Sequence, residues 1–237
     1  MDLRFCQNNT IAIISMNRGE NKLNVEFLNQ LNNALDQIER NPSIQVVITT
    51  GKGRFYSNGI DLSFYGTNPD KYPEFGKILV ATLKRLLVFP ILTIAAINGH
   101  AFAGGMLLAL AHDLRVMRTG HGWMSFNEIY LKIRFPPAML DLIKCKIPPG
   151  PTRLSAIMFG KRFTAEEALI SKLVDRSASA ENLLAESIRL GQEVCGTEVF
   201  DRAMFQHMKS DLYKNTVDAL DLMLKQQTSG TSLKSQL

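Results

Sequence analysis

The residues of this chain that could do chemistry gather in two glycine-containing turns and at one acidic position. Asn58-Gly59-Ile60-Asp61 and Ala103-Gly104-Gly105 each follow a predicted strand and precede a predicted helix. Glycine lets a ligand approach the backbone, and the first N–H groups of a helix have no partner within it. Such N–H groups could stabilise a developing negative charge, as an oxyanion hole does. A glycine pair also permits tight strand–helix packing, so neither turn alone indicates a site.

Glu128 is the acidic position. It lies in the mixed segment 123–137, close in sequence to Phe126, Ile129 and Leu131. Two interpretations are open: a carboxylate at a solvated helix start, or a carboxyl whose pKa is raised toward the working pH by apolar neighbours. Two turns with free backbone N–H groups and one such carboxyl are what stabilising and protonating a thioester enolate would need.

Apolar patterning predicts an α/β layer that positions these residues. The polar loop 51–62 leaves the carboxyl end of a buried strand, where ligands of open α/β sheets usually bind. Asn24 and Asp61 are expected to cap helices. The predicted strands are 3–6, 10–16, 45–50, 91–97 and 114–117, and the predicted helices are 24–40, a short one after Asp61, one ending near residue 88 after a connection at 66–74, and 106–111.

The remainder of the chain reads as helical. Thr164, with Glu166-Glu167 behind it, predicts a capped helix start. One long final helix is predicted by an apolar stripe of Phe200, Met204, Met208 and Leu212, continued by Val217, Leu220 and Leu224. The Ser/Thr/Gly/Lys-rich segment 228–237 is expected to be disordered. The predicted helices are 138–144, 152–159, 164–172, 180–193 and 197–226.

Composition limits the class of protein. The chain has 237 residues, 46% of them hydrophobic, so it can bury a substantial core. The net charge of +5 permits an anionic ligand, but no dense basic run indicates nucleic acid. Neither the three cysteines nor the four histidines have the spacing of a metal site. No apolar run approaches the ~18 residues of a membrane helix, so a soluble intracellular protein is expected.

Three ordered motifs closely resemble the crotonase, or enoyl-CoA hydratase/isomerase, superfamily. They are Phe55 to Leu62, Ala95 to Gly105, and Asp113-Leu114-Arg115, and Asn21-Lys22-Leu23-Asn24 is similar to the family's segment beside the CoA moiety. The resemblance implies an α/β crotonase-like spiral of ββα repeats with a helical C-terminal region, assembled as a homotrimer or hexamer. It divides the chain into a core (1–190), a helical trimerisation or packing region (191–227) and a tail (228–237).

The resemblance also assigns roles. The family's two oxyanion-hole N–H groups fall on Ile60 and Gly104. Hydratases of the superfamily carry two glutamates, and the first of these positions is Leu107 here, whereas Glu128 matches the second. This single-acid pattern resembles the Δ3,Δ2-enoyl-CoA isomerases, including the plant-type peroxisomal forms. It implies that Glu128 moves a proton from C2 to C4 of a 3-enoyl thioester, with no cofactor, because coenzyme A is part of the substrate.

Acyl-CoA binding is expected along the first turn and the segment preceding it. Lys22 is a candidate for the CoA phosphates, although it could equally be an ordinary exposed lysine. Asp61 is expected to act through its capping role, and the run Arg134 to Pro137 differs from the glycine-rich run of many relatives. The predicted substrate-binding residues are Lys22, Leu23, Ser57, Asn58, Gly59, Ile60, Asp61 and Gly104.

Other functions stay open at this point. The C-terminal Ser235-Gln236-Leu237 approximates the Ser-Lys-Leu address, which suggests a peroxisomal protein and an import receptor as partner, with the cytoplasm as the other location. The alternatives to the isomerase are a crotonase-fold enzyme for another acyl-CoA, including a hydratase, and a non-catalytic acyl-CoA-binding or RNA-binding protein. Only the basic composition favours RNA binding, so a nucleic-acid partner is not expected.

Overall fold

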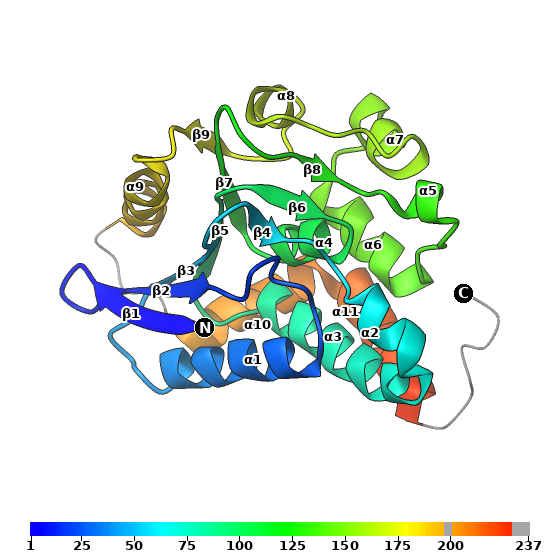
Figure 1. Cartoon of the computed structure of the whole chain (residues 1–237). Helices are drawn as coiled ribbons and strands as arrows, with labels where there is room; N and C mark the ends of the chain where they lie inside the picture. The colour runs from blue at the N-terminus through cyan, green and yellow to red at the C-terminus, as the bar shows by residue number, and fades with distance from the viewer. Residues whose placement is uncertain (197–200, 229–237) are drawn as a thin grey trace.

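The computed structural model describes residues 1–196 and 201–228 and contains two sheets (Figure 1). In the larger sheet the strand order is β1-β2-β3-β5-β7-β9, and only β1 runs antiparallel to its neighbour. The smaller sheet is parallel, in the order β4-β6-β8. The strands are β1 Asp2–Cys6, β2 Ile11–Met16, β3 Val46–Gly51, β4 Phe55–Ser57, β5 Leu92–Ile97, β6 His100–Phe102, β7 Leu114–Arg118, β8 Met124–Ser125 and β9 Arg176–Ala178.

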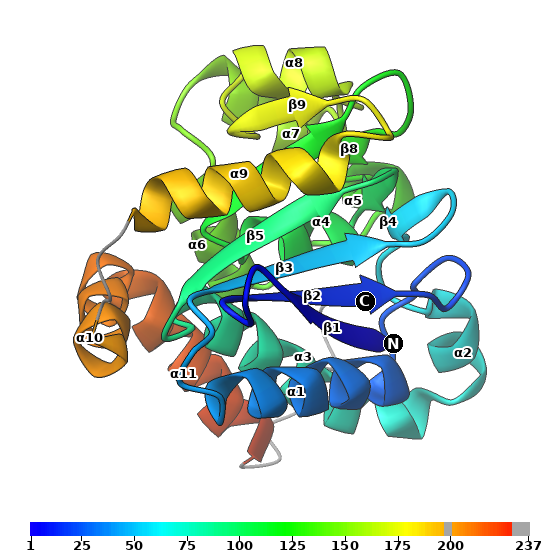
Figure 2. The ribbon, with the colours of Figure 1, turned by 90° about the vertical axis from the view of Figure 1, so that its left-hand side faces the viewer.

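Helices cover both faces of the larger sheet. Figure 2 shows α9 lying across one face, where Leu183 and Leu190 pack with strand residues such as Ile94 and Val116. The helices are α1 Val25–Glu39, α2 Leu62–Thr67, the 3₁₀ helix η1 Pro69–Lys71, α3 Tyr72–Leu87, α4 Gly104–Leu110, α5 Glu128–Leu131, α6 Pro137–Lys146, α7 Pro151–Met158, α8 Ala165–Ile170, α9 Leu183–Cys195, α10 Arg202–Leu212 and α11 Lys214–Thr228. Among the described residues, no helix has the length and apolar character to cross a membrane.

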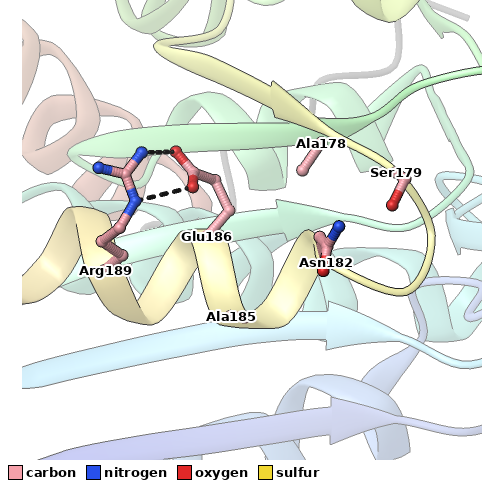
Figure 3. Close-up of a pocket in the computed structure, with 6 residues that line it drawn as sticks. All are labelled: Ala178, Ser179, Asn182, Ala185, Glu186 and Arg189. Atoms are coloured by element: carbon pink, nitrogen blue, oxygen red, sulfur yellow. Dashed lines mark hydrogen bonds and ion pairs between the residues drawn. The ribbon is translucent and has the colours of Figure 1, made fainter.

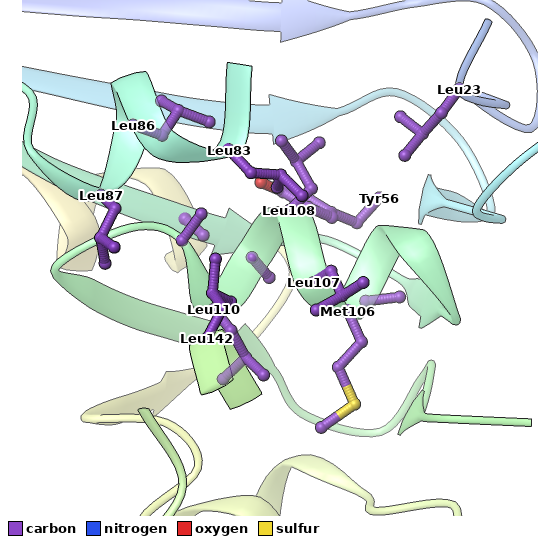
Figure 4. Close-up of a cluster of buried hydrophobic side chains, with 14 of the residues drawn as sticks. Leu23, Tyr56, Leu83, Leu86, Leu87, Met106, Leu107, Leu108, Leu110 and Leu142 are labelled. Carbon is purple, nitrogen blue, oxygen red and sulfur yellow. The ribbon is translucent and has the colours of Figure 1, made fainter. Parts of the chain in front are cut away.

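The main core lies on the other face of the sheet, around α4. Every residue of α4 is buried, as its unbroken apolar sequence predicts. Figure 4 shows its leucines beside Leu83, Leu86 and Leu87 of α3 and Leu142 of α6. The core therefore surrounds α4 on all sides. Its packing fixes the position of the first turn of the helix, which includes Gly104.

The predicted helix caps are confirmed. The Asn24 side chain accepts a hydrogen bond from the Phe27 N–H, and Asp61 accepts one from the Phe64 N–H. Thr164 and Glu167 form a reciprocal capping box at the start of α8. Each pattern is local, so the sequence contains all the information that the cap requires.

Four short strands were missing from the sequence prediction. β4, β6 and β8 are two or three residues long, too short to show alternation, yet they form the second sheet. β9 was also missed, because residues 176–178 are only half buried. The predicted connection 66–74 contains the end of α2, all of η1 and the start of α3.

The prediction of one long final helix was wrong. The chain forms α10 and α11, which break at Tyr213, a residue with φ −105° and ψ 20°. Met204, Met208 and Leu212 of the predicted stripe are exposed on α10, whereas Leu220 of α11 is fully buried, so the two helices do not share one buried face. Phe200, most of the predicted tail and the Ser235-Gln236-Leu237 tripeptide lie outside the described residues.

Candidate active site

The first turn is held by the segment that precedes α1. The Leu23 N–H donates to the Gly59 carbonyl at 2.7 Å, and the Asp61 N–H donates to the Leu23 carbonyl at 3.1 Å. Leu23 itself is fully buried. Between these two bonds, the Ile60 N–H donates no hydrogen bond to any described residue. The turn therefore presents one unused backbone donor at a fixed position.

Asn21 was not among the predicted site residues, yet it anchors this turn. Its buried side-chain amide donates to the carbonyls of Met16, Phe55 and Tyr56 at 3.1–3.2 Å. Its own carbonyl accepts from the Ser57 hydroxyl at 2.7 Å, and the Ser57 Oγ accepts from the Gly59 N–H at 3.3 Å. Asn21 has a φ of +49°, a conformation that asparagine tolerates better than most residues. That tolerance, and the place of Asn21 in the segment similar to the family's, are the sequence signals for its role.

The second turn leads into α4 through Ala103, whose backbone conformation is unfavourable for alanine. Ala103 has φ +49° and ψ −122°, a region that favours glycine. Its carbonyl accepts from Met106 and Leu107, while the N–H of Gly104 donates to no described residue. A Cβ on Gly105 would stand 2.2 Å from the Ser57 carbonyl oxygen, so only glycine permits this approach of α4 to β4.

The two turns meet at these glycines. A Cβ on Gly59 would lie 3.1 Å from the Gly104 nitrogen, and a Cβ on Gly104 would lie 3.5 Å from the Ile60 nitrogen. The two unused N–H groups thus belong to neighbouring stretches of backbone. Paired donors of this kind can bind an oxygen that gains negative charge.

Glu128 is the first residue of α5 and is buried, with 8% of its surface exposed. The alternative of a solvated helix-start carboxylate is therefore wrong. Burial raises the pKa of its carboxyl from the usual 4.5 to about 7. Its Oε2 atom has no hydrogen-bond partner among the described residues, and neither does the neighbouring Asn127 Oδ1. One oxygen of this buried carboxyl therefore has no partner within the described protein.

Backbone pairing links the segment that carries Glu128 to the second turn. Strand β8 pairs with β6, so that Ser125 lies opposite Phe102. The Ala103 N–H then donates to the Ser125 carbonyl at 2.9 Å, three residues before Glu128. Leu107, one helical turn into α4, is 94% buried and contributes no polar group. The segment that carries Glu128 is therefore joined through the backbone to the turn that carries the Gly104 donor.

The remaining predicted binding residues are mostly engaged with the protein. Lys22 Nζ forms an ion pair with Glu20 at 3.1 Å, and the Asn58 amide donates to the same carboxylate at 3.1 Å. The Asp61 carboxylate accepts from the Ser63 hydroxyl at 2.7 Å and from the Phe64 N–H. Asp61 thus shapes the start of α2, as its capping pattern predicts.

A separate cavity of about 360 Å³ lies over α9 and contains none of these residues (Figure 3). It is lined by Ala178, Ser179, Asn182, Ala185, Glu186 and Arg189. Glu186 and Arg189, the charged residues of this lining, are one helical turn apart and form an ion pair at 2.7 Å. Their charges therefore neutralise each other. Within the described residues, no cluster of three or more histidine, cysteine or acidic side chains could hold a metal ion.

The fold and the candidate site together describe an α/β protein with two unused backbone N–H groups and, within the described residues, one buried acid, Glu128. The family model described as enoyl-CoA hydratase/isomerase matches residues 6–235. The chain belongs to this family, the crotonase superfamily, and adopts the crotonase fold. Membership implies an acyl-CoA substrate.

Relatives with different activities are similar to this chain. Enoyl-CoA delta isomerase 1, peroxisomal, of Arabidopsis thaliana is 32% identical, over 74% of this chain and 75% of the relative. Enoyl-CoA delta isomerase 2, peroxisomal, of the same plant is 30% identical over 86% and 88%. Carnitinyl-CoA dehydratase of Salmonella arizonae is 32% identical over 81% and 74%. The human mitochondrial delta3-delta2-enoyl-CoA isomerase structure superposes with a TM-score of 0.86 at 25% identity, covering 99% and 92%.

Proposed function

We propose that this protein is a Δ3,Δ2-enoyl-CoA isomerase in which Glu128 is the only proton carrier. The observation that supports this best is the Glu128 carboxyl itself, which is buried, has an unpaired oxygen and has a pKa raised to about 7. A carboxyl with that pKa can both take and return a proton near neutral pH.

The reaction needs only one acid. Ionised Glu128 takes a proton from C2 of a 3-enoyl thioester, and the electron pair moves into the thioester carbonyl to give a dienolate. The Ile60 and Gly104 N–H groups donate to the resulting oxyanion. The protonated Glu128 then delivers the same proton to C4, and the double bond is left between C2 and C3. Each oxyanion donor is worth about 3–4 kcal/mol of barrier.

Leu107 favours this reaction over hydration. Adding water to a double bond requires groups that orient the water and move its proton. A buried leucine at the position of the first hydratase glutamate can do neither. Hydration of an enoyl-CoA is the second candidate function, because a relative named as a dehydratase is 32% identical to this chain. The leucine at position 107 makes this candidate the weaker one.

Substrate binding is proposed along the first turn. The substrate carbonyl lies between Ile60 and Gly104, and the CoA phosphates lie near Lys22, whose side chain is 37% exposed and forms an ion pair with Glu20. Leu23, Ser57, Asn58, Gly59 and Asp61 shape this segment. A positive charge at Lys22 would attract phosphate over short distances in moderate salt.

We also propose a homotrimer or hexamer, packed through the C-terminal helical region 191–227, and a peroxisomal location. Two Arabidopsis relatives carry "peroxisomal" in their names, which supports the second proposal. Removal of Ser235-Gln236-Leu237 from a fluorescent fusion should disperse it from peroxisomes. A fusion that never enters peroxisomes would refute the location alone.

The isomerase is tested by conversion of 3-cis- or 3-trans-hexenoyl-CoA to the 2-trans isomer, with a separate hydratase as the coupling enzyme. The wild-type protein should turn over. Glu128→Gln should lose about 10²–10⁴-fold in kcat while it still binds the thioester and remains folded. A wild-type protein that binds the substrate without converting it would refute the proposal, as would hydration of a 2-enoyl-CoA without the coupling enzyme.

A further inference from the structure

A second cavity of about 360 Å³ contains none of the proposed catalytic residues. It lies where the loop before β4, the start of β6, the β7–β8 loop and the start of α8 meet. Arg54, His100, His121, Trp123 and Glu166 contribute to its wall. Its volume is at the lower end of the range for small-molecule sites.

His100 is the buried polar residue of this cavity. It is 97% buried, and its Nδ1 atom has no hydrogen-bond partner among the described residues. Its ring centroid lies 5.0 Å from that of Trp123 and 5.3 Å from that of His121. On another side the ring stacks on Phe102 at 5.0 Å. The imidazole is thus held by aromatic rings while its hydrogen-bonding capacity is not fully used.

A close backbone contact builds this wall. A Cβ on Gly122 would stand 2.6 Å from the Gly99 carbonyl carbon, so the β7–β8 loop rests directly on the turn before β6. This contact brings His121 and Trp123, on either side of Gly122, to His100. Since the arrangement depends on the backbone, the positions of the rings are defined by the fold.

The charge around His100 is mainly positive. Arg54 lines the cavity, and the Arg162 guanidinium lies 5.3 Å from the centroid of the Trp123 ring. Burial lowers the pKa of His100, and His121, Arg54 and Arg162 lower it further. Glu166 is the one acid in the wall of this cavity, and it is exposed. An anion would therefore find more positive than negative charge there.

We propose that this cavity binds a small organic anion, a phosphate or carboxylate carried on a flat apolar body. Arg54 and His100 would contact the anionic group, and Trp123 would contact the body. Arginine suits this role because its planar guanidinium matches both phosphate and carboxylate. The cavity shares no lining residue with the proposed acyl-CoA site, and the proposal does not depend on the isomerase reaction.

Trp123 provides the measurement, because it is the only tryptophan of the chain. The full-length protein is titrated with phenyl phosphate and with benzoate at constant ionic strength, and indole fluorescence is followed. A saturable change is expected with at least one anion, and the tighter of the two identifies the anionic group. Phenol, which has the ring without the charge, should give no saturable change.

Two variants and one matched control complete the test. Arg54→Gln and His100→Phe should each weaken binding at least about tenfold, the loss expected for one charge-assisted hydrogen bond. His100→Phe keeps an aromatic ring against Phe102 and Trp123, so folding should be retained. Arg40→Gln, which removes an exposed arginine at the end of α1, should bind as the wild type does. No saturable change in the wild type, equal binding of phenol, or unchanged binding in both variants would overturn the proposal.

Discussion

The Ile60 nitrogen lies 3.5 Å from the point at which a side chain on Gly104 would begin. The two residues are 44 positions apart in sequence, and each has a backbone N–H without a partner in the described chain. Gly104→Ala would therefore place a methyl group against the Ile60 donor. We expect kcat to fall about 10²–10³-fold, the usual effect of losing one oxyanion donor.

A second glycine serves as the control for that variant. Gly66 lies in α2, and a Cβ there would meet no atom within 4 Å. Gly66→Ala should keep full activity in the same hexenoyl-CoA assay. If Gly104→Ala were fully active and folded, Ile60 and Gly104 would not form the proposed oxyanion hole.

The raised pKa of Glu128 predicts a pH profile. The free enzyme needs an ionised carboxylate to take the C2 proton, so kcat/KM should rise with pH through a pKa near 7. Measurement between pH 5 and 9 checks this. A profile of kcat/KM that is already flat above pH 5 would mean that the Glu128 carboxyl of the free enzyme has an ordinary pKa, and would contradict this prediction.

The same shift predicts that stability falls as pH rises. Above pH 4.5 the unfolded carboxyl ionises while the folded one, with a pKa of about 7, keeps its proton, so the unfolded state binds fewer protons. The free energy of unfolding should lose about 3 kcal/mol from this group between pH 4.5 and 7. Glu128→Gln removes that term, so the variant should be more stable than the wild type at pH 8 by a similar amount. Denaturant unfolding that shows a pH-independent difference would contradict this.

Backbone strain at Ala103 predicts a stabilising substitution. Its φ of +49° is unfavourable for alanine by about 1–3 kcal/mol, whereas glycine adopts it freely. Ala103→Gly should raise the free energy of unfolding by about 1 kcal/mol after the entropic cost of glycine. Ala111→Gly, at the other end of α4 with φ −66°, should instead lower it. Thermal unfolding of the pair tests the sign.

A buried ion pair between Lys209 and Asp113 connects α10 to the core. Lys209 Nζ lies 2.6 Å from Asp113 Oδ2 and also donates to the carbonyls of Phe89 and Ile91. Lys209→Met should cost about 3–5 kcal/mol, because it leaves the Asp113 carboxylate without its cation. Lys214→Met, which breaks an exposed pair with Asp218, should change stability by less than about 1 kcal/mol. Equal effects of the two would show that the Lys209 pair is not buried in solution.

Local patterns allowed much of the fold to be predicted from the sequence. Asn24, Asp61 and the Thr164–Glu167 pair cap helices at the expected positions, because a cap depends on residues within one turn. The second sheet escaped prediction because its strands are stabilised by partners far away in the chain, as Ala101 is by Met124. The break at Tyr213 escaped as well, since the apolar spacing continues past it.

The candidate site, like the fold, was predictable only where the signal is local in sequence. The two turns and Glu128 could be identified as residues, but the contact between Gly59 and Gly104 is made by the tertiary structure. Neither the bonds of the Asn21 amide nor the φ of Ala103 follows from residue type, because each depends on carbonyls brought in from other strands.

Because Asn21 anchors the first turn, the groups that bind the thioester carbonyl are held independently of the group that moves the proton. The Ile60 donor is positioned by Asn21, Leu23 and Ser57, and the turn with the Gly104 donor is bonded to the Ser125 carbonyl; none of these bonds involves an acidic side chain. A chain in which Glu128 has been exchanged should therefore still hold and polarise a thioester. Such a scaffold could acquire a new reaction by placing one different side chain above an oxyanion site that remains intact.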